Sequence, residues 1–234
     1  MSEACNIAPP SGPPHHLAQL RRLAPFAALD APALEALARV CAVRRYTDGE
    51  LMMLEGDDRA PALFVLEGAV RVYRTNLEGR EQTLIILRAG EGLNLPAAFA
   101  DIRLAPCSAC AVGPTEALAI GLDDLEALAR RWPGIALAFL RHLSNRLQHL
   151  TNLTYDLSLL SVRARLARFL LAQSREPEEV PLRWTHAQIA ARIGTVRVVV
   201  SRTLSALADE GLIRLNRQRI EIADPEALEL MAEE

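Results

Sequence analysis

The 234-residue sequence predicts an α+β protein. We expect an N-terminal β-roll of jelly-roll type, a long helix, and a C-terminal winged helix-turn-helix. Two short amphipathic helices flank a glycine within residues 185–213, short β-rich runs recur roughly every ten residues between 41 and 122, and leucines follow helical spacing along 140–157. Half of the residues are hydrophobic, and the chain is long enough for two modest domains, so disorder is not expected.

The segment 185–213, THAQIAARIGTVRVVVSRTLSALADEGLI, has the pattern of two helices joined by a tight turn. Gly194 stands where the turn needs a positive backbone angle, and the small Ala190 lets the helices cross closely. Helical spacing directs one set of side chains inward: Val196, Val200, Leu204 and Leu207. The set left on the outer surface is Thr195, Arg197, Val198, Ser201 and Arg202. This layout is typical of a helix-turn-helix whose second helix enters the major groove, so double-stranded DNA is the expected partner.

The residues that follow this segment predict a wing. Residues 212–223 read as two short strands around a polar turn that contains Arg217. Seven arginines lie between residues 183 and 219 against Asp209 and Glu210, a local excess of five positive charges on a chain of net charge −3. Such a basic patch is what phosphate binding requires, and we expect Arg217 to contact DNA.

Changes in composition and hydrophobic periodicity along the chain divide it into four expected parts. These are a proline-rich flexible arm (1–16), the β-roll with N-terminal helices (17–122), a long dimerisation helix (123–160) and the winged-helix domain (161–234). Within the first helices, Asp30 followed by Pro32 indicates a helix start.

The long helix carries three heptads of a and d positions: Leu140, Leu143, Leu147, Leu150, Thr154 and Leu157. This stripe could pack on the chain's own β-roll or form the seam of a parallel homodimer. The dimer is the better interpretation, because two helix-turn-helix units on a two-fold axis can read half-sites ~34 Å apart.

Targeting signals are not apparent in the sequence. No apolar run approaches the ~20 residues of a membrane span, and the first residues lack the basic start and apolar core of a signal peptide. We therefore expect a cytoplasmic protein with no membrane partner, in which the four cysteines are thiols or ligands and not disulfides.

In its order of parts the chain resembles the cAMP receptor protein/fumarate-nitrate reduction regulator (CRP/FNR) superfamily of bacterial transcription factors. The segments that carry the resemblance are DGELMMLEGDDRAPALFVLEGAVRVYR in the β-roll and IGTVRVVVSRTLSALADEGLI in the helix-turn-helix. The resemblance implies promoter binding as a homodimer, contact with RNA polymerase, and gating by a signal in the β-roll.

The resemblance also implies four base-reading positions: Arg197, Val198, Ser201 and Arg202. Both arginines can donate a bidentate pair of hydrogen bonds to the O6 and N7 atoms of guanine. Val198 departs from the glutamate of many members, because valine offers only apolar contact to a thymine methyl group. His186 and Thr195 stand near helix N-termini, where phosphate contact is expected.

In cyclic-nucleotide-binding members, a Gly-Glu pair and an Arg-Ser pair hold the ribose and the cyclic phosphate. The matching positions here are Asn94 and Leu95, and Cys107 and Ser108. Loss of the arginine removes a charge-assisted, bidentate hydrogen bond to the phosphate, and loss of the glutamate removes a hydrogen-bond partner for a ribose hydroxyl. The sequence thus argues against cAMP, with a cyclic-nucleotide-responsive regulator of the same fold as the alternative.

The cysteines are further sensor candidates: Cys5, Cys41, Cys107 and Cys110. Four cysteines suit an iron–sulfur cluster, but their spacing differs from that of the oxygen-sensing members. Cys107 and Cys110 lie three apart in an expected strand, where they would face opposite sides unless a turn or bulge intervenes. Buried hydrophobes, a redox or metal sensor, and haem or another small ligand remain open.

An enzyme of the cupin type is a further alternative, because cupins also consist of a β-barrel. Cupins bind metal through clustered histidines and glutamates on strands. Residues 41–122 contain no histidine, so we do not expect an enzyme.

Overall fold

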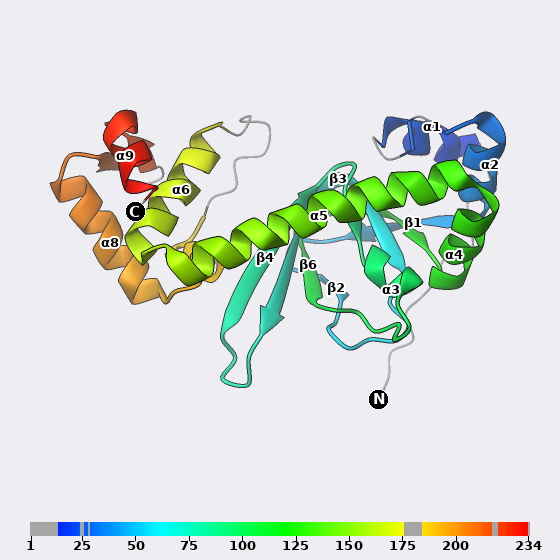
Figure 1. Ribbon diagram of the computed structural model, residues 1–234, viewed down its shortest axis with the longest axis horizontal. Coiled ribbons are helices and arrows are strands. Elements are labelled where there is room, and N and C mark those ends of the chain that lie inside the picture. Colours follow the sequence, from blue (N-terminus) through cyan, green and yellow to red (C-terminus); the bar gives the residue numbers. More distant parts are fainter. Residues whose placement is uncertain (1–13, 24–25, 28, 176–183, 217–219, 234) are drawn as a thin grey trace. The chain divides into compact units, whose positions relative to one another are not determined.

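The computed structural model describes residues 14–23, 26–27, 29–175, 184–216 and 220–233 (Figure 1). The chain divides into two compact units. The first comprises residues 1–73 and 85–147, and the second comprises residues 74–84 and 148–234.

The first unit begins with helices α1 (Pro14–Arg22) and α2 (Ala31–Val40). The Asp30 carboxylate accepts a hydrogen bond from the backbone N–H of Ala33 at 3.0 Å, which confirms the helix start expected there. Leu34 and Leu37 of α2 are buried and pack into the core of this unit.

An antiparallel sheet forms the body of the first unit, except that residues 74–84, which connect two of its strands, belong to the second unit. Its strands are β1 (Cys41–Tyr46), β2 (Leu51–Met53), β3 (Ala62–Thr75), β4 (Glu81–Arg88), β5 (Gly92–Leu93) and β6 (Ser108–Ile120). The order is β1-β6-β3-β4, with β2 also paired to β6 and β5 paired to β3. The order does not follow the sequence, because the chain crosses over between neighbouring strands, as in the expected β-roll.

Glycines between the β-rich runs of the sequence are turn signals, but two of them do not separate strands. The runs on either side of Gly68 join into the single strand β3, and those around Gly113 join into β6. Register shifts near Gly68 mark a bulge, and its φ of +84° favours glycine. An added Cβ there would lie 2.5 Å from the carbonyl oxygen of Pro114, so close strand contact also requires glycine. The predicted turn signals are therefore bulges within long strands.

Helices complete the first unit. The short helix α3 (Leu95–Phe99) follows β5. The segment expected as one helix (123–160) is divided at Trp132 into α4 (Leu122–Arg131) and the long helix α5 (Pro133–Leu159), and residues 148–159 of α5 belong to the second unit. Phe139 of α5 packs with Phe26 and Phe64, whose ring centroids each lie 6.1 Å from its own. This aromatic cluster fixes the N-terminal part of α5 on the sheet.

The second unit contains α6 (Val162–Arg175), α7 (His186–Ile193), α8 (Arg197–Asp209), β7 (Ile213–Leu215), β8 (Ile220–Ile222) and α9 (Pro225–Met231). The two strands pair antiparallel as the wing. The sequence did not predict α9, which packs on α6 through the buried Leu228. A β-roll, a long helix and a winged helix-turn-helix confirm the predicted α+β class. Among the described helices, none is long and apolar enough to cross a membrane.

Candidate DNA interface and effector site

Helix α7 is fixed at both ends by local chemistry. The Thr185 side chain accepts from the backbone N–H of Gln188 at 3.2 Å, and the Gln188 side chain accepts from that of Thr185 at 2.8 Å. Gly194 ends the helix with φ +68°, and the backbone N–H of Thr195 donates to the carbonyl of Ala190. The turn between the helices is therefore the glycine turn that the sequence predicts.

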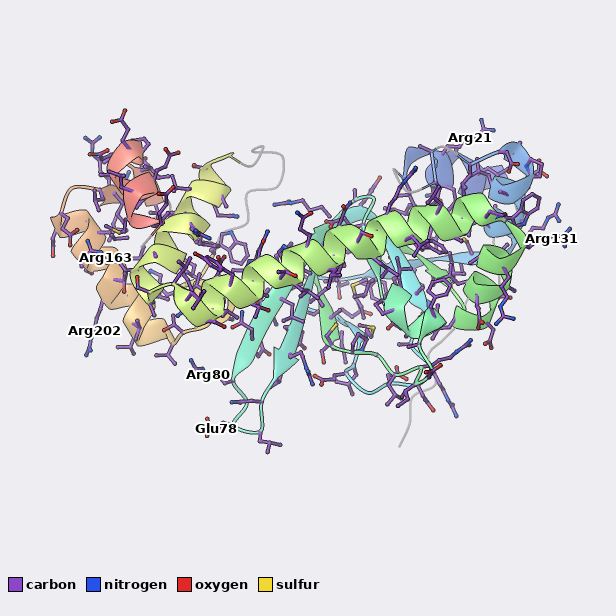
Figure 2. The ribbon with its side chains drawn as sticks, viewed as in Figure 1. Arg21, Glu78, Arg80, Arg131, Arg163 and Arg202 are labelled. Carbon is purple, nitrogen blue, oxygen red and sulfur yellow. The ribbon has the colours of Figure 1, made fainter. Side chains whose placement is uncertain are left out.

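Helix α8 has one buried face and one exposed face. Val200, Leu204 and Leu207 are buried in the core of the second unit. The four predicted base-reading residues are all exposed: Arg197, Val198, Ser201 and Arg202. Figure 2 shows the Arg202 side chain pointing outward from α8. This face has the composition and accessibility that major-groove readout needs.

Two residues differ from the predicted division of the side chains into an inward-facing and an exposed set. Val196 was expected to face inward, but it is the N-cap of α8 and its side chain is 45% exposed. It lies before the first helical turn, so helical spacing does not apply to it. Ser205 is exposed one turn after Ser201 and extends the reading face, although sequence reasoning did not include it.

The remaining predicted DNA contacts fall in different settings. His186 is the first residue of α7 and is partly buried, as is Thr195 in the turn. Arg217 lies outside the described residues. Arg192, counted in the basic patch, is also partly buried, and its Nη1 donates to the carbonyl of Leu84 at 3.1 Å. It therefore serves packing within the second unit, and the charge available to DNA is smaller than the sequence count.

The predicted effector residues lie around β5, α3 and the start of β6. Asn94 is 4% exposed and adopts a left-handed backbone with φ 62°. Its Nδ2 donates to the carbonyl of Ala60 at 2.9 Å, while its Oδ1 is buried without a hydrogen-bond partner. The buried Ser108 accepts from the backbone N–H of Glu55 at 3.1 Å. The unmatched Asn94 oxygen is a position where a ligand N–H or O–H could donate.

The two remaining positions of the nucleotide motif hold buried side chains, a leucine and a thiol. Leu95 is 1% exposed and belongs to the core of the first unit, and Cys107 is also buried. Neither side chain can neutralise a phosphate or accept from a ribose hydroxyl. These residues do not fit cAMP in the way that the family motif does.

Helix α5 supplies two polar groups to this region, Arg146 and His142, and of these sequence reasoning missed Arg146. An Arg146 Nη2 atom lies 3.9 Å from an oxygen of Glu91, and burial lowers the pKa of this arginine, opposed by that carboxylate. His142, one turn earlier, places Nε2 3.2 Å from the carbonyl oxygen of Gly92. Burial and then Arg146 lower the pKa of His142. Their spacing of four on a predicted helix was the available signal, but the sequence alone does not show which strand they face.

The cysteines do not form one cluster site. Cys41 pairs with Ile120 at one end of β6, and Cys110 pairs with Leu51 near the other end. Ten residues of strand separate these positions, roughly 30 Å. Cys41 therefore cannot share a cluster with Cys107 or Cys110, and the four-cysteine hypothesis is wrong in that form.

The environments of the single cysteines differ. Burial, with the charge of Asp124 as a smaller cause, raises the pKa of Cys41 to about 12, so this thiol is an inert core residue. Cys110 is partly exposed, and Cys5 lies outside the described residues. In the part of the chain that the structure describes, no three His, Cys, Asp or Glu residues gather closely enough to hold a metal ion.

The fold defines a helix-turn-helix protein of the DNA-binding class with an N-terminal β-roll domain. Comparison with known proteins agrees. Residues 43–131 match the cyclic nucleotide-binding domain family, and residues 164–231 match the Crp-like helix-turn-helix domain family.

Known regulators match most of the chain. The chain is 37% identical to the cyclic AMP receptor protein of Thermus thermophilus over 81% of its own length and 87% of the relative's. It is 27% identical to the global nitrogen regulator of Synechocystis, over 80% of its own length and 86% of that regulator's. The crystal structure of a CRP/FNR-family regulator, also from Thermus thermophilus, superposes with a TM-score of 0.69 at 26% identity, over 82% of this chain and 98% of that one. The chain belongs to the CRP/FNR family of transcriptional regulators, which are not enzymes.

Proposed function

We propose that this protein is a homodimeric regulator that binds a near-palindromic promoter site in the cytoplasm and responds to a small ligand other than cAMP at its β-roll. Contact with RNA polymerase belongs to the same proposal. The observation that carries the proposal is the exposed face of α8. This face presents Arg197, Val198, Ser201 and Arg202 to solvent, and the opposite face of the helix is buried in the core of the second unit.

The chemistry of this face suggests the half-site. Arg197 and Arg202 each have the planar fork that bonds guanine O6 and N7 in the major groove. Val198 is 57% exposed and has no hydrogen-bonding group, so it favours a thymine methyl at the position that it faces. The half-site should therefore combine two guanine contacts with one apolar contact.

Helix α5 supports the homodimer. Leu140 is 60% exposed, Leu147 is 68% exposed and Leu150 is 37% exposed, all on the predicted heptad stripe. Leu143 instead packs against the core of the first unit. An apolar stripe of this length on one helix is stabilised when a second copy covers it.

The effector region supports a ligand with hydrogen-bond donors and negative charge. Asn94 Oδ1 can accept from the ligand, and Arg146 can attract an anionic group. Leu95 and Cys107 argue against cAMP, since the motif groups for ribose and phosphate are replaced by buried apolar side chains. The relative named cyclic AMP receptor protein keeps a cyclic nucleotide as the second candidate.

Selection from a pool of random duplexes, followed by fluorescence anisotropy over a range of salt concentrations, tests DNA recognition. We expect an enriched two-fold symmetric site and an affinity that falls steeply with salt, because several phosphates are neutralised. An unenriched pool and no salt dependence would contradict the proposal.

Calorimetric titration with cAMP tests the effector separately. We expect no binding heat. Micromolar binding that is lost in Arg146→Gln would establish the cyclic nucleotide as the effector, with Arg146 in place of the motif arginine.

A further inference from the structure

A pocket of about 250 Å³ lies entirely within the second unit, between the C-terminal part of α5, helix α6 and the end of α7. Its ionisable lining residues are His149, Asp156, Arg165, Arg168 and Arg192. The amides of Asn152 and Gln173 and apolar residues, among them Phe169, form the rest. The volume is slightly below that of typical small-molecule sites, which suits a small metabolite.

The one carboxylate among these residues is already neutralised. Asp156 Oδ1 accepts a hydrogen bond from Arg168 Nη1 at 2.7 Å. Arg168 also donates through Nε to the carbonyl of Ala232 at 2.7 Å, which holds its guanidinium at the wall. The hydrogen bond of Asp156 Oδ1 therefore goes to Arg168, and Asp156 acts on Arg165 through its charge.

Arg165 has unused hydrogen-bonding capacity. Its Nε is buried without a partner in the described part of the chain, and its Nη1 makes a long contact of 3.4 Å to the carbonyl of Leu157. Burial lowers the pKa of Arg165, with Asp156 opposing. A buried guanidinium donor without a partner is costly, and an anion in the pocket would remove that cost.

The pocket adjoins the turn of the helix-turn-helix. A Cβ placed on Gly194 would lie 3.5 Å from Arg165 Nη1 and 2.5 Å from Leu157 Cδ2. Arg192 lines the pocket two residues before this glycine, and α8 begins three residues after it. A ligand that orders Arg165 and Arg192 therefore acts on the backbone that positions the DNA-reading helix.

We propose that this pocket is a second ligand site, separate from the β-roll, which binds a small organic phosphate through Arg165 and thereby changes the affinity of α8 for DNA. The guanidinium groups recognise the phosphate. The apolar wall around Phe169 covers the carbon skeleton, which distinguishes a sugar phosphate from the inorganic ion.

Isothermal titration calorimetry on the full chain, without DNA, tests the site with ribose 5-phosphate, inorganic phosphate and ribose. We expect ribose 5-phosphate to bind, inorganic phosphate to bind more weakly and ribose not to bind. Arg165→Gln should weaken the binding of ribose 5-phosphate by roughly tenfold or more, as for a lost charged hydrogen bond. Arg165→Lys keeps the charge and should retain part of the affinity.

Arg163→Gln is the matched control, because Arg163 is on the same helix but pairs with Glu210 outside the pocket. It should bind ribose 5-phosphate like the wild type. Anisotropy with the selected duplex should then show that ribose 5-phosphate shifts DNA affinity in the wild type and not in Arg165→Gln.

Several results would overturn the proposal. These are the absence of heat from both phosphates at millimolar concentration, unchanged affinity in Arg165→Gln, and loss of binding in Arg146→Gln instead, which would place the ligand at the β-roll. Equal affinity for inorganic phosphate and ribose 5-phosphate would overturn the inference that the pocket recognises the carbon skeleton of an organic phosphate. Because the calorimetry contains no DNA, failure of the proposed DNA recognition would leave these readouts intact.

Discussion

Thr185 and Gln188 hold the start of α7 through reciprocal hydrogen bonds, each side chain accepting from the other residue's backbone N–H. This capping box satisfies two donors that a helix N-terminus otherwise leaves without partners. Thr185→Ala should lower the free energy of unfolding by about 1 kcal/mol. Urea denaturation measures this change. Ser205→Ala, at an exposed position inside α8, is the control and should leave stability nearly unchanged.

Gly194 and Gly211 form a natural comparison, because both have positive φ, +68° and +77°. At Gly211 nothing lies within 4 Å of an added Cβ, so Gly211→Ala should cost only backbone strain, about 1 kcal/mol. At Gly194 the added Cβ would also meet side-chain ends, Leu157 Cδ2 at 2.5 Å and Gln82 Oε1 at 3.0 Å, which must shift, so Gly194→Ala should cost up to about 1 kcal/mol more than Gly211→Ala. Urea denaturation of both variants gives the difference. Equal loss of stability in both would show that the contact with Leu157 is easily relieved.

Local signals predicted the helix-turn-helix well. Gly194, the buried set from Val200 to Leu207 and the exposed arginines of α8 all follow from spacing along a single segment. The error at Val196 arises where the helix has not yet begun. The strands were harder, because Gly68 reads as a turn but serves as a bulge that only the pairing of β3 with β6 reveals.

Features made by distant segments could not be predicted from the sequence. Arg146 faces Glu91 across the first unit, and Arg165, Arg192 and His149 meet in the pocket from three helices. Spacing places each residue on a helix face, but which element that face meets depends on tertiary packing. The same reason explains why the cysteines could be counted from the sequence, whereas the separation of Cys41 from Cys110 follows only from the pairing of strands with β6.

The Cys41 thiol should make stability fall at alkaline pH. In the unfolded chain the Cys41 thiol loses its proton near the ordinary pKa of 9.0. In the folded protein burial raises this pKa to about 12. The associated stability is therefore complete below pH ~9 and is lost as the pH rises toward ~12. Between pH ~8 and ~10 the wild type should lose about 1 kcal/mol more than Cys41→Ala. The same loss in both proteins would show that other groups cause the alkaline change.

Leu150 tests the dimer seam. Leu150→Glu places a charge on the apolar stripe of α5 and should shift the protein toward monomers in sedimentation velocity. Asn145→Glu adds the same charge at an exposed position off the a and d stripe and should leave the assembly intact. If both variants sediment like the wild type, the dimer does not use this stripe.

Arg202 should read a base and not merely the DNA backbone. Its side chain is exposed on α8 and points outward (Figure 2), so it is placed to fork onto guanine. Arg202→Ala should weaken binding to the selected duplex by ~1–3 kcal/mol and relax the preference at one base pair. Binding to random duplexes should change much less, because backbone attraction does not depend on sequence. Anisotropy with both duplexes measures the two effects, and an equal loss on both would make Arg202 a phosphate contact.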